Sequence, residues 1–271
     1  MTNIDKEKFN KNGYLVLNNF ISDDECQVLI DRATKIVLKY KSDKHIKFYS
    51  KNNSINSDKY FLDSANNISI FFEELALDEN NNLRQPILLS VNKLGHALHE
   101  KDPVFKNFSN SQSLSSICSQ LDMNIPFCIQ SMYIFKQPRI GGEVTYHQDA
   151  TFLYTEPSSV IGFWWALEDA TINNGCLWVL PKGHKDYKLR KRFIRKKDGK
   201  MDYNIFDHKP WLSSKFIPLE VKKGTLIILD GLLPHGSSEN HSKKSRHAYS
   251  LHFVDNSKSY PQDNWLQKDI T

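Results

Sequence analysis

The sequence has few cysteines and no long hydrophobic run. Its four cysteines, Cys26, Cys118, Cys128 and Cys176, include no C-x-x-C pair. This spacing argues against a zinc or disulfide framework and predicts reduced thiols in an intracellular protein. The longest apolar run, 160–167, has the length of a strand, well below the roughly 18 residues of a membrane span. The N-terminus lacks the apolar segment of a secretory signal, so we expect a cytoplasmic protein with no membrane span.

Acidic and basic residues are nearly equal in number over the whole chain, but they are unevenly distributed along it. Apolar residues make up 39% and charged residues 25%, and the net charge is +5, values that exclude collagen-like and largely disordered proteins. Residues 185–200 hold nine basic and two acidic side chains, a net +7. The other 255 residues hold 27 basic and 29 acidic ones, a net −2. This basic segment lacks interleaved aromatics, so we expect no nucleic-acid partner. An exposed charged surface and an element that attracts an anionic substrate both remain open interpretations.

The first part of the chain, about residues 1–125, has mainly the pattern of helices. Ser22 and Glu25 have the spacing of a capping box, which predicts a helix over 23–40. Other helices are expected over 5–12, 86–100 and 114–121, strands over 14–17 and 68–72, and a polar loop over 42–68.

From about residue 126 to 260 the pattern changes to short strands separated by Gly, Pro and Asn. The expected strands cover 129–136, 144–147, 160–167, 176–180, 216–221, 225–229 and 246–254. Many short strands at this spacing predict a barrel or a double-sheet jelly roll. We therefore expect residues 1–271 to form one α+β domain, mainly β, whose N-terminal helices brace one sheet.

A His-x-Asp pair, His147-Gln148-Asp149, is the first candidate for a metal site. Residues i and i+2 of a strand point to the same face, so the imidazole and the carboxylate can converge on one ion. A third ligand would complete the two-His-one-carboxylate triad of non-heme Fe(II) enzymes. A second pair, His184 and Asp186, sits in a turn before the basic segment, which would repel a cation. The first pair is therefore favoured.

His235 is the candidate third ligand because a buried strand pattern leads into the Gly/Pro-bounded turn that carries it. An ordinary loop histidine is the alternative interpretation. Arg246 opens the last alternating strand, and a buried arginine needs a carboxylate partner. A bound dicarboxylic co-substrate or a distant Asp or Glu could each supply that partner.

The order of these motifs is specific over most of the chain. His-Gln-Asp is followed by a Trp-bearing strand, Glu168-Asp-Ala-Thr, Asn174-Gly-Cys-Leu-Trp, Pro181-x-Gly-His, and finally His235 and Arg246. The stretches QSMYIFKQP at 130–138 and HQDATFLYTEP at 147–157 are the longest matching motifs, and 91–99, 246–249 and 264–267 match as well. With these motifs the sequence resembles the phytanoyl-CoA dioxygenase family.

The resemblance implies a double-stranded β-helix, the jelly-roll or cupin-like core of Fe(II)- and 2-oxoglutarate-dependent dioxygenases. It implies O2 as a co-substrate and ascorbate as a reductant. It assigns His147, Asp149 and His235 to iron as the catalytic ligands. The residues that it assigns to the 2-oxoglutarate pocket are Arg246, which would hold the distal carboxylate, Ser237, a hydroxyl donor, and Lys93, Met132 and Trp164. Trp165 would then point away from the pocket, since neighbours on a strand face opposite sides.

The retained carboxylate at position 149 favours hydroxylation of a C–H bond, because halogenating relatives leave that place to chloride. The substrate implied is a small molecule or an acyl compound, anionic if the basic segment acts on it, and the segment 184–216 is the expected lid. We expect a monomer. The main alternative is a non-catalytic metal-binding jelly roll, a pseudo-enzyme or sensor. A zinc hydrolase has less support, because no glutamate stands beside the pair as a general base.

Overall fold

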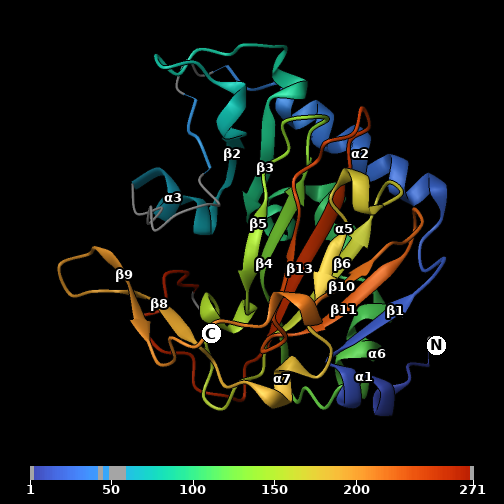
Figure 1. Ribbon diagram of the computed structural model, residues 1–271, viewed down its shortest axis with the longest axis vertical. Helices are drawn as coiled ribbons and strands as arrows, with labels where there is room; N and C mark the ends of the chain where they lie inside the picture. The colour runs from blue at the N-terminus through green and yellow to red at the C-terminus, as the bar shows by residue number, and fades with distance from the viewer. Residues whose placement is uncertain (1–2, 42–44, 49–58, 269–271) are drawn as a thin grey trace.

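The computed structural model describes residues 3–41, 45–48 and 59–268, and its strands form two antiparallel sheets and a separate hairpin (Figure 1). The larger sheet has the strand order β1 (Tyr14–Leu17), β11 (Leu226–Asp230), β6 (Ile161–Ala166), β13 (Ala248–Asp255), β4 (Pro126–Ile134), β3 (Val91–His96) and β2 (Ile68–Phe72). The smaller sheet has the order β10 (Ile217–Leu219), β7 (Leu177–Val179), β12 (His235–Ser237) and β5 (Val144–His147). The hairpin pairs β8 (Lys191–Arg195) with β9 (Met201–Ile205).

The chain passes back and forth between the two sheets, as a double-stranded β-helix requires. Strands β4, β6, β11 and β13 lie in the larger sheet, while β5, β7, β10 and β12 lie in the smaller one. A core between the sheets joins Trp164 and Ile227 of the larger sheet to Leu177 and Val179 of the smaller one. The predicted fold class, α+β with a jelly-roll core, is confirmed.

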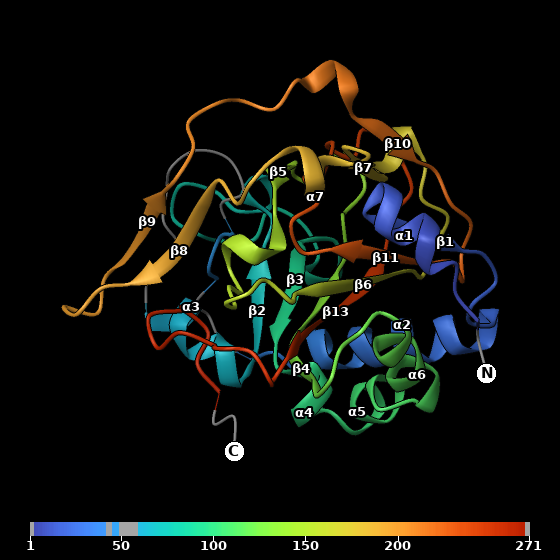
Figure 2. The same ribbon diagram turned by 90° about the horizontal axis from the view of Figure 1, so that it is seen from below.

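Helices cover the outer face of the larger sheet, opposite the smaller sheet (Figure 2). The helices on this face are α2 (Asp23–Leu38), α4 (Leu98–Lys101), α5 (Pro103–Ser109) and α6 (Gln112–Gln120), whereas α1 (Lys6–Asn12) lies beside β1. Leu29 of α2 and Ile117 of α6 share a hydrophobic core with Trp165 of β6. This core keeps the outer face of the sheet dry, so the inner face is left for the site. No helix in the described ranges has the length and apolar character to cross a membrane.

Helix α2 begins where the sequence predicts. The Ser22 hydroxyl accepts a hydrogen bond from the Glu25 amide, and the Glu25 carboxylate accepts one from the Ser22 amide. These two bonds satisfy amide groups that have no partner within the helix, so the capping box is confirmed. The helix ends at Leu38, two residues before the predicted end.

The helix predicted over 86–100 is wrong. The segment contains the 3-10 turn Ile87–Leu89, the strand β3 and the short helix α4. Strand β3 lies between β2 and β4, and five of its six residues are buried. A strand with both faces covered loses the alternation of apolar and polar residues, so its pattern cannot be told from that of a buried helix.

Three other segments differ from their prediction. The polar loop expected over 42–68 contains α3 (Lys59–Asp63) and a 3-10 turn, while 42–44 and 49–58 lie outside the described residues. The expected turn around His235 is the strand β12, and the expected lid segment 184–216 contains the β8–β9 hairpin. The N-terminal part also supplies β1, β2 and β3 to the larger sheet, so it is less purely helical than predicted.

Candidate metal and co-substrate site

A cavity of about 440 Å³ opens between the two sheets and the β8–β9 hairpin. All eight site residues predicted from the sequence line it: Lys93, Met132, His147, Asp149, Trp164, His235, Ser237 and Arg246. They come from both sheets, from the turn after β5 and, for Arg246, from the segment just before β13. The fold therefore gathers residues that are up to 153 positions apart in the sequence.

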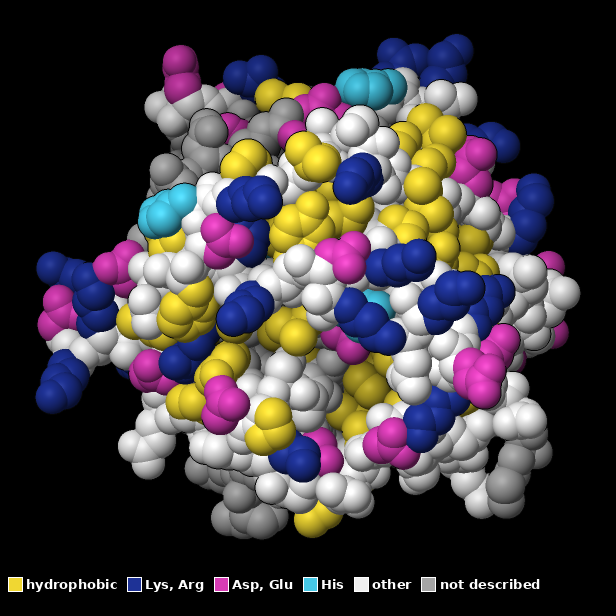
Figure 3. Space-filling view, turned by 60° about the horizontal axis from the view of Figure 1, so that its bottom comes forward, with side chains coloured by type: hydrophobic (Ala, Val, Ile, Leu, Met, Phe, Trp, Pro, Cys, Tyr) yellow, Lys and Arg dark blue, Asp and Glu magenta, His cyan; other side chains and the backbone are white. Residues whose placement is uncertain are grey.

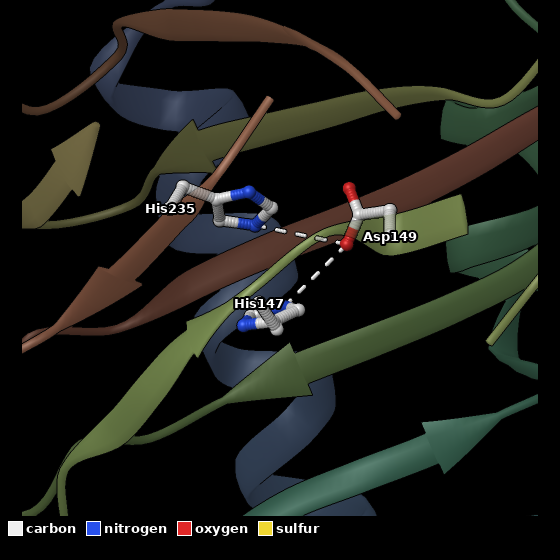
Figure 4. A group of neighbouring side chains, drawn as sticks. All are labelled: His147, Asp149 and His235. Carbon is white, nitrogen blue, oxygen red and sulfur yellow. Dashed lines mark ion pairs between the residues drawn. The ribbon is translucent and has the colours of Figure 1, made fainter. Parts of the chain in front are cut away.

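Strand pairing places the two histidines side by side. His147 ends β5 and stands opposite His235 on β12, and their ring centroids are 4.4 Å apart. Asp149 begins the 3-10 turn that follows β5. Its Oδ1 lies 3.6 Å from the Nε2 atom of each histidine, and the three ligand atoms lie within 4.8 Å of one another (Figure 4). Within the described ranges, this is the group of His, Cys, Asp and Glu side chains that could hold a metal ion.

Backbone contacts decide which nitrogen of each ring faces the carboxylate. The Nδ1 atom of His147 lies 2.9 Å from the Thr145 carbonyl oxygen, and that of His235 lies 3.0 Å from the Leu233 carbonyl oxygen. A carbonyl can only accept, so each Nδ1 carries the hydrogen and each neutral ring presents the lone pair of Nε2. Burial lowers the pKa of His235 to about 4, so this ring is neutral at pH 7.

The Asp149 carboxylate is ionised, and one of its two oxygens lacks a hydrogen-bond partner. Burial by itself raises the pKa of this carboxyl, but the nearby His252 and His235 outweigh that effect and the pKa lies well below its ordinary value. Its Oδ2 has no hydrogen-bond partner among the described residues, and its near neighbour is His252 Nε2 at 3.3 Å. Two imidazole lone pairs thus face a carboxylate oxygen, an arrangement that a cation between them would stabilise.

Gln148, the residue between the two predicted ligands, joins three segments and is fully buried. Its side-chain amide donates hydrogen bonds to the carbonyls of Lys188 and Leu232 and accepts one from the Arg190 amide. These bonds tie the His-x-Asp segment to the base of the hairpin and to the loop before His235. Outer contacts of this kind fix ligand orientation.

Arg246 is a buried cation with no anion beside it. Its side chain is 1% exposed, its Nε donates to the Gly175 carbonyl, and its guanidinium carbon lies 5.2 Å from the centre of the Trp164 ring. Its Nη1 has no partner, and no Asp or Glu of the described chain forms an ion pair with it. Burial lowers its pKa to about 10. Of the two sequence-based interpretations, the distant acidic partner therefore finds no support in the described residues.

Three lysines also line the cavity, Lys93, Lys136 and Lys191, and of these Lys93 was predicted. Lys93 is on β3, not on a helix, and its ammonium lies 3.9 Å from the Met132 sulfur and 3.5 Å from the centre of the Phe48 ring. Burial lowers its pKa to about 7. Sequence reasoning missed Lys136, which is 2% exposed and donates to the Ser237 hydroxyl at 2.9 Å. Its place in the QSMYIFKQP stretch was the available signal.

The second His-x-Asp pair lies apart from this cavity. His184 and Asp186 belong to the short helix α7 (Gly183–Asp186), and His184 Nε2 contacts the Asn10 carbonyl of α1. The two sequence pairs therefore separate as predicted: one lines the cavity and the other packs against an N-terminal helix.

Comparison with known proteins bears on the family. A family model described as phytanoyl-CoA dioxygenase (PhyH) matches residues 9–248. The chain is 47% identical over 263 residues to a phytanoyl-CoA dioxygenase of Arabidopsis thaliana, covering 96% of this chain and 91% of the relative. It is 39% identical over 270 residues to phytanoyl-CoA dioxygenase domain-containing protein 1 of Mus musculus, covering 96% and 93%.

A solved structure agrees with the fold. EctD from S. alaskensis, crystallised with 2-oxoglutarate and 5-hydroxyectoine, matches with a TM-score of 0.63 at 17% identity, covering 94% of this chain and 77% of that one. At this identity the likeness concerns the jelly roll alone. The family model and the relatives span nearly the whole chain, so the predicted family and its enzyme class are confirmed: this chain belongs to the phytanoyl-CoA dioxygenase family.

Proposed function

We propose that this chain is an Fe(II)- and 2-oxoglutarate-dependent dioxygenase that hydroxylates a C–H bond of its substrate and releases succinate and CO2. One observation carries the proposal: two imidazoles whose Nδ1 atoms contact backbone carbonyls turn their Nε2 atoms toward one ionised, buried carboxylate. Two histidines and one carboxylate grouped in this way suit a non-heme iron and would leave its other coordination positions open.

His147, Asp149 and His235 would hold the iron, which supplies O2 activation when it is bound. Arg246 would bind the distal carboxylate of 2-oxoglutarate, because a buried guanidinium without an anion fits a planar, bidentate acceptor. Trp164 beside the guanidinium, Met132 and Lys93 would line the same pocket. Ser237 would take part through its hydroxyl, which Lys136 holds in place.

The chain's own contribution is to position groups and exclude water. The Thr145 and Leu233 carbonyls hold the two imidazoles in the ligating tautomer. Buried side chains of both sheets keep bulk water from the inner end of the cavity, where charges interact more strongly. Asp149 would hold the iron where a halogenating enzyme would need a halide, and this ligand set favours hydroxylation over halogenation.

The substrate is proposed as a small molecule or an acyl compound. The family name points to acyl-CoA compounds, and EctD was crystallised with the small molecule 5-hydroxyectoine. Aromatic side chains such as Phe48, Phe152 and Phe193 line the cavity of this chain and suit an apolar body.

Succinate formation tests the proposal. The purified protein with Fe(II), ascorbate, O2 and 2-oxoglutarate is expected to form succinate slowly without substrate, and Asp149→Ala is expected to abolish this turnover. Full succinate formation by Asp149→Ala would contradict the ligand assignment. Tight metal binding with no turnover would favour a pseudo-enzyme or sensor instead.

A further inference from the structure

The β8–β9 hairpin forms one wall of the cavity. Lys191 and Phe193 lie on the same face of β8, and Phe193 pairs with Tyr203 on β9. All three side chains line the cavity that also contains the triad. Of the nine basic residues in segment 185–200, Lys191 is the one that lines the cavity.

Lys191 is a half-buried cation without an acidic partner. Its ammonium lies 3.8 Å from the centre of the Tyr203 ring, and no Asp or Glu of the described chain forms an ion pair with it. Burial, and then the charge of Arg190, lowers its pKa. Its side chain is therefore kept from water without the compensation of a carboxylate.

Other cations of the same segment are neutralised within the protein. Arg192 pairs with Asp263, Lys196 with Asp202, and Lys200 lies 3.9 Å from Asp198. These ion pairs give part of the basic segment a structural role in the hairpin. Acidic side chains are therefore present on this hairpin, and Lys191, which lines the cavity, pairs with neither Asp198 nor Asp202.

The walls near Lys191 are apolar. Phe61, Phe152, Leu153 and Trp265 line the cavity and belong to one hydrophobic cluster with Phe193. On the molecular face drawn in Figure 3, basic and acidic side chains lie among exposed hydrophobic ones. A ligand that fits both the unpaired Lys191 and the apolar walls carries an apolar body and one anionic group.

We propose that Lys191 binds an anionic group, a carboxylate or a phosphate, of a substrate whose apolar body lies among these aromatic side chains. The inference rests on the proposed function, since it assigns this ligand to the same site. It names a specificity-determining residue, which touches the substrate at the hairpin wall and takes no part in holding iron or 2-oxoglutarate.

Three matched probes test this proposal: octanoate, octyl phosphate and methyl octanoate. Each is titrated by calorimetry into the Fe(II)- and 2-oxoglutarate-loaded protein without O2, at low salt. We expect at least one of the two anions to bind about tenfold more tightly than the neutral ester, the size of one charge-assisted hydrogen bond. The stronger of the two identifies which anion the subsite prefers.

Variants locate the effect. Lys191→Met is expected to remove the preference for anions and leave ester binding unchanged, whereas Lys191→Arg retains the preference. Lys197→Met, an exposed lysine of the same hairpin turn, is the matched control and should behave as the wild type. Equal binding of ester and anions by the wild type, an undiminished preference in Lys191→Met, or no binding of any probe would each overturn the proposal.

The two proposals fail in different ways. Loss of anion preference with intact substrate-free succinate formation contradicts only the role of Lys191. Anion binding by a protein that forms no succinate contradicts only the proposed catalysis. The calorimetric readout does not depend on turnover, so each result can be assigned.

Discussion

Replacing Arg246 by Met should stabilise the protein without ligands and destroy its response to 2-oxoglutarate. The guanidinium is 1% exposed and has no acidic partner in the described chain, and burial lowers its pKa well below the ordinary value, to about 10. A depression of this size corresponds to about 3 kcal/mol of unfavourable free energy in the folded state. Because the folded pKa is the lower one, the cost is complete below about pH 10 and disappears only as the pH approaches the pKa of an exposed arginine.

The variant also loses one favourable contact. The hydrogen bond from Arg246 to the Gly175 carbonyl contributes about 1 kcal/mol. The net expectation for Arg246→Met is a gain of about 2 kcal/mol in the free energy of unfolding of the metal-free protein. Methionine has nearly the length of the arginine stem, so the change leaves little empty volume.

Urea unfolding followed by circular dichroism measures both the stability without ligands and the response to 2-oxoglutarate. Without ligands, the midpoint of Arg246→Met should lie above that of the wild type at equal slope. With Mn(II) and 2-oxoglutarate at about 100 times Kd, the wild type should gain about 2.7 kcal/mol and the variant nothing beyond the metal effect.

Arg246→Lys is the control, since it keeps the buried charge and should gain no stability. A marked loss of stability in Arg246→Met would refute the reasoning, because it would mean that the charge is compensated in the unliganded fold. Undiminished stabilisation by 2-oxoglutarate would refute the assignment of its distal carboxylate to this residue.

Three further predictions concern the surroundings of the site. His252→Leu removes the near neighbour of Asp149 Oδ2 and should weaken Mn(II) binding about 10- to 100-fold by calorimetry; unchanged affinity would contradict a role in orienting the carboxylate. Gly162→Ala should weaken Mn(II) binding to a similar degree, since the new Cβ would lie 2.9 Å from Asp149 Oδ2. Burial lowers the pKa of Lys93 to about 7, so this lysine binds its proton less tightly in the folded state than in the unfolded one. The free energy of unfolding, measured in urea, should therefore rise between pH 7 and 10.5. Lys93→Met should flatten this rise, and an equal rise in the variant would disprove the prediction.

Local patterns predicted much of the fold. The strand Val144–His147 and the capping box at Ser22 lie where the sequence places them, because strand alternation and amide capping act between near neighbours. Prediction was wrong at β3, since burial on both faces erases the alternation that marks a strand. It also missed the β8–β9 hairpin, whose basic residues hid the pairing.

Some residues of the candidate site could be predicted from the sequence and others could not. His147, Asp149, His235 and Arg246 were predicted from spacing, turn signals and family resemblance, and their roles as ligands stay predictions. Lys136 and His252 were not predicted: Lys136 lies within the QSMYIFKQP stretch, but neither residue has a spacing that indicates its partner. Both became visible only through contacts across the fold, with Ser237 and Asp149 respectively.

By itself the sequence determined the kinds of groups present: a His-x-Asp pair on a strand end, a distal histidine, a lone arginine and one basic segment. These follow from covalent order and from interactions between close neighbours. Only the tertiary structure decided that Arg246 and Lys191 both line the cavity and that neither forms an ion pair with a carboxylate of the described residues. Whether a charge is compensated depends on burial and on partners distant in sequence, and folding alone brings those together.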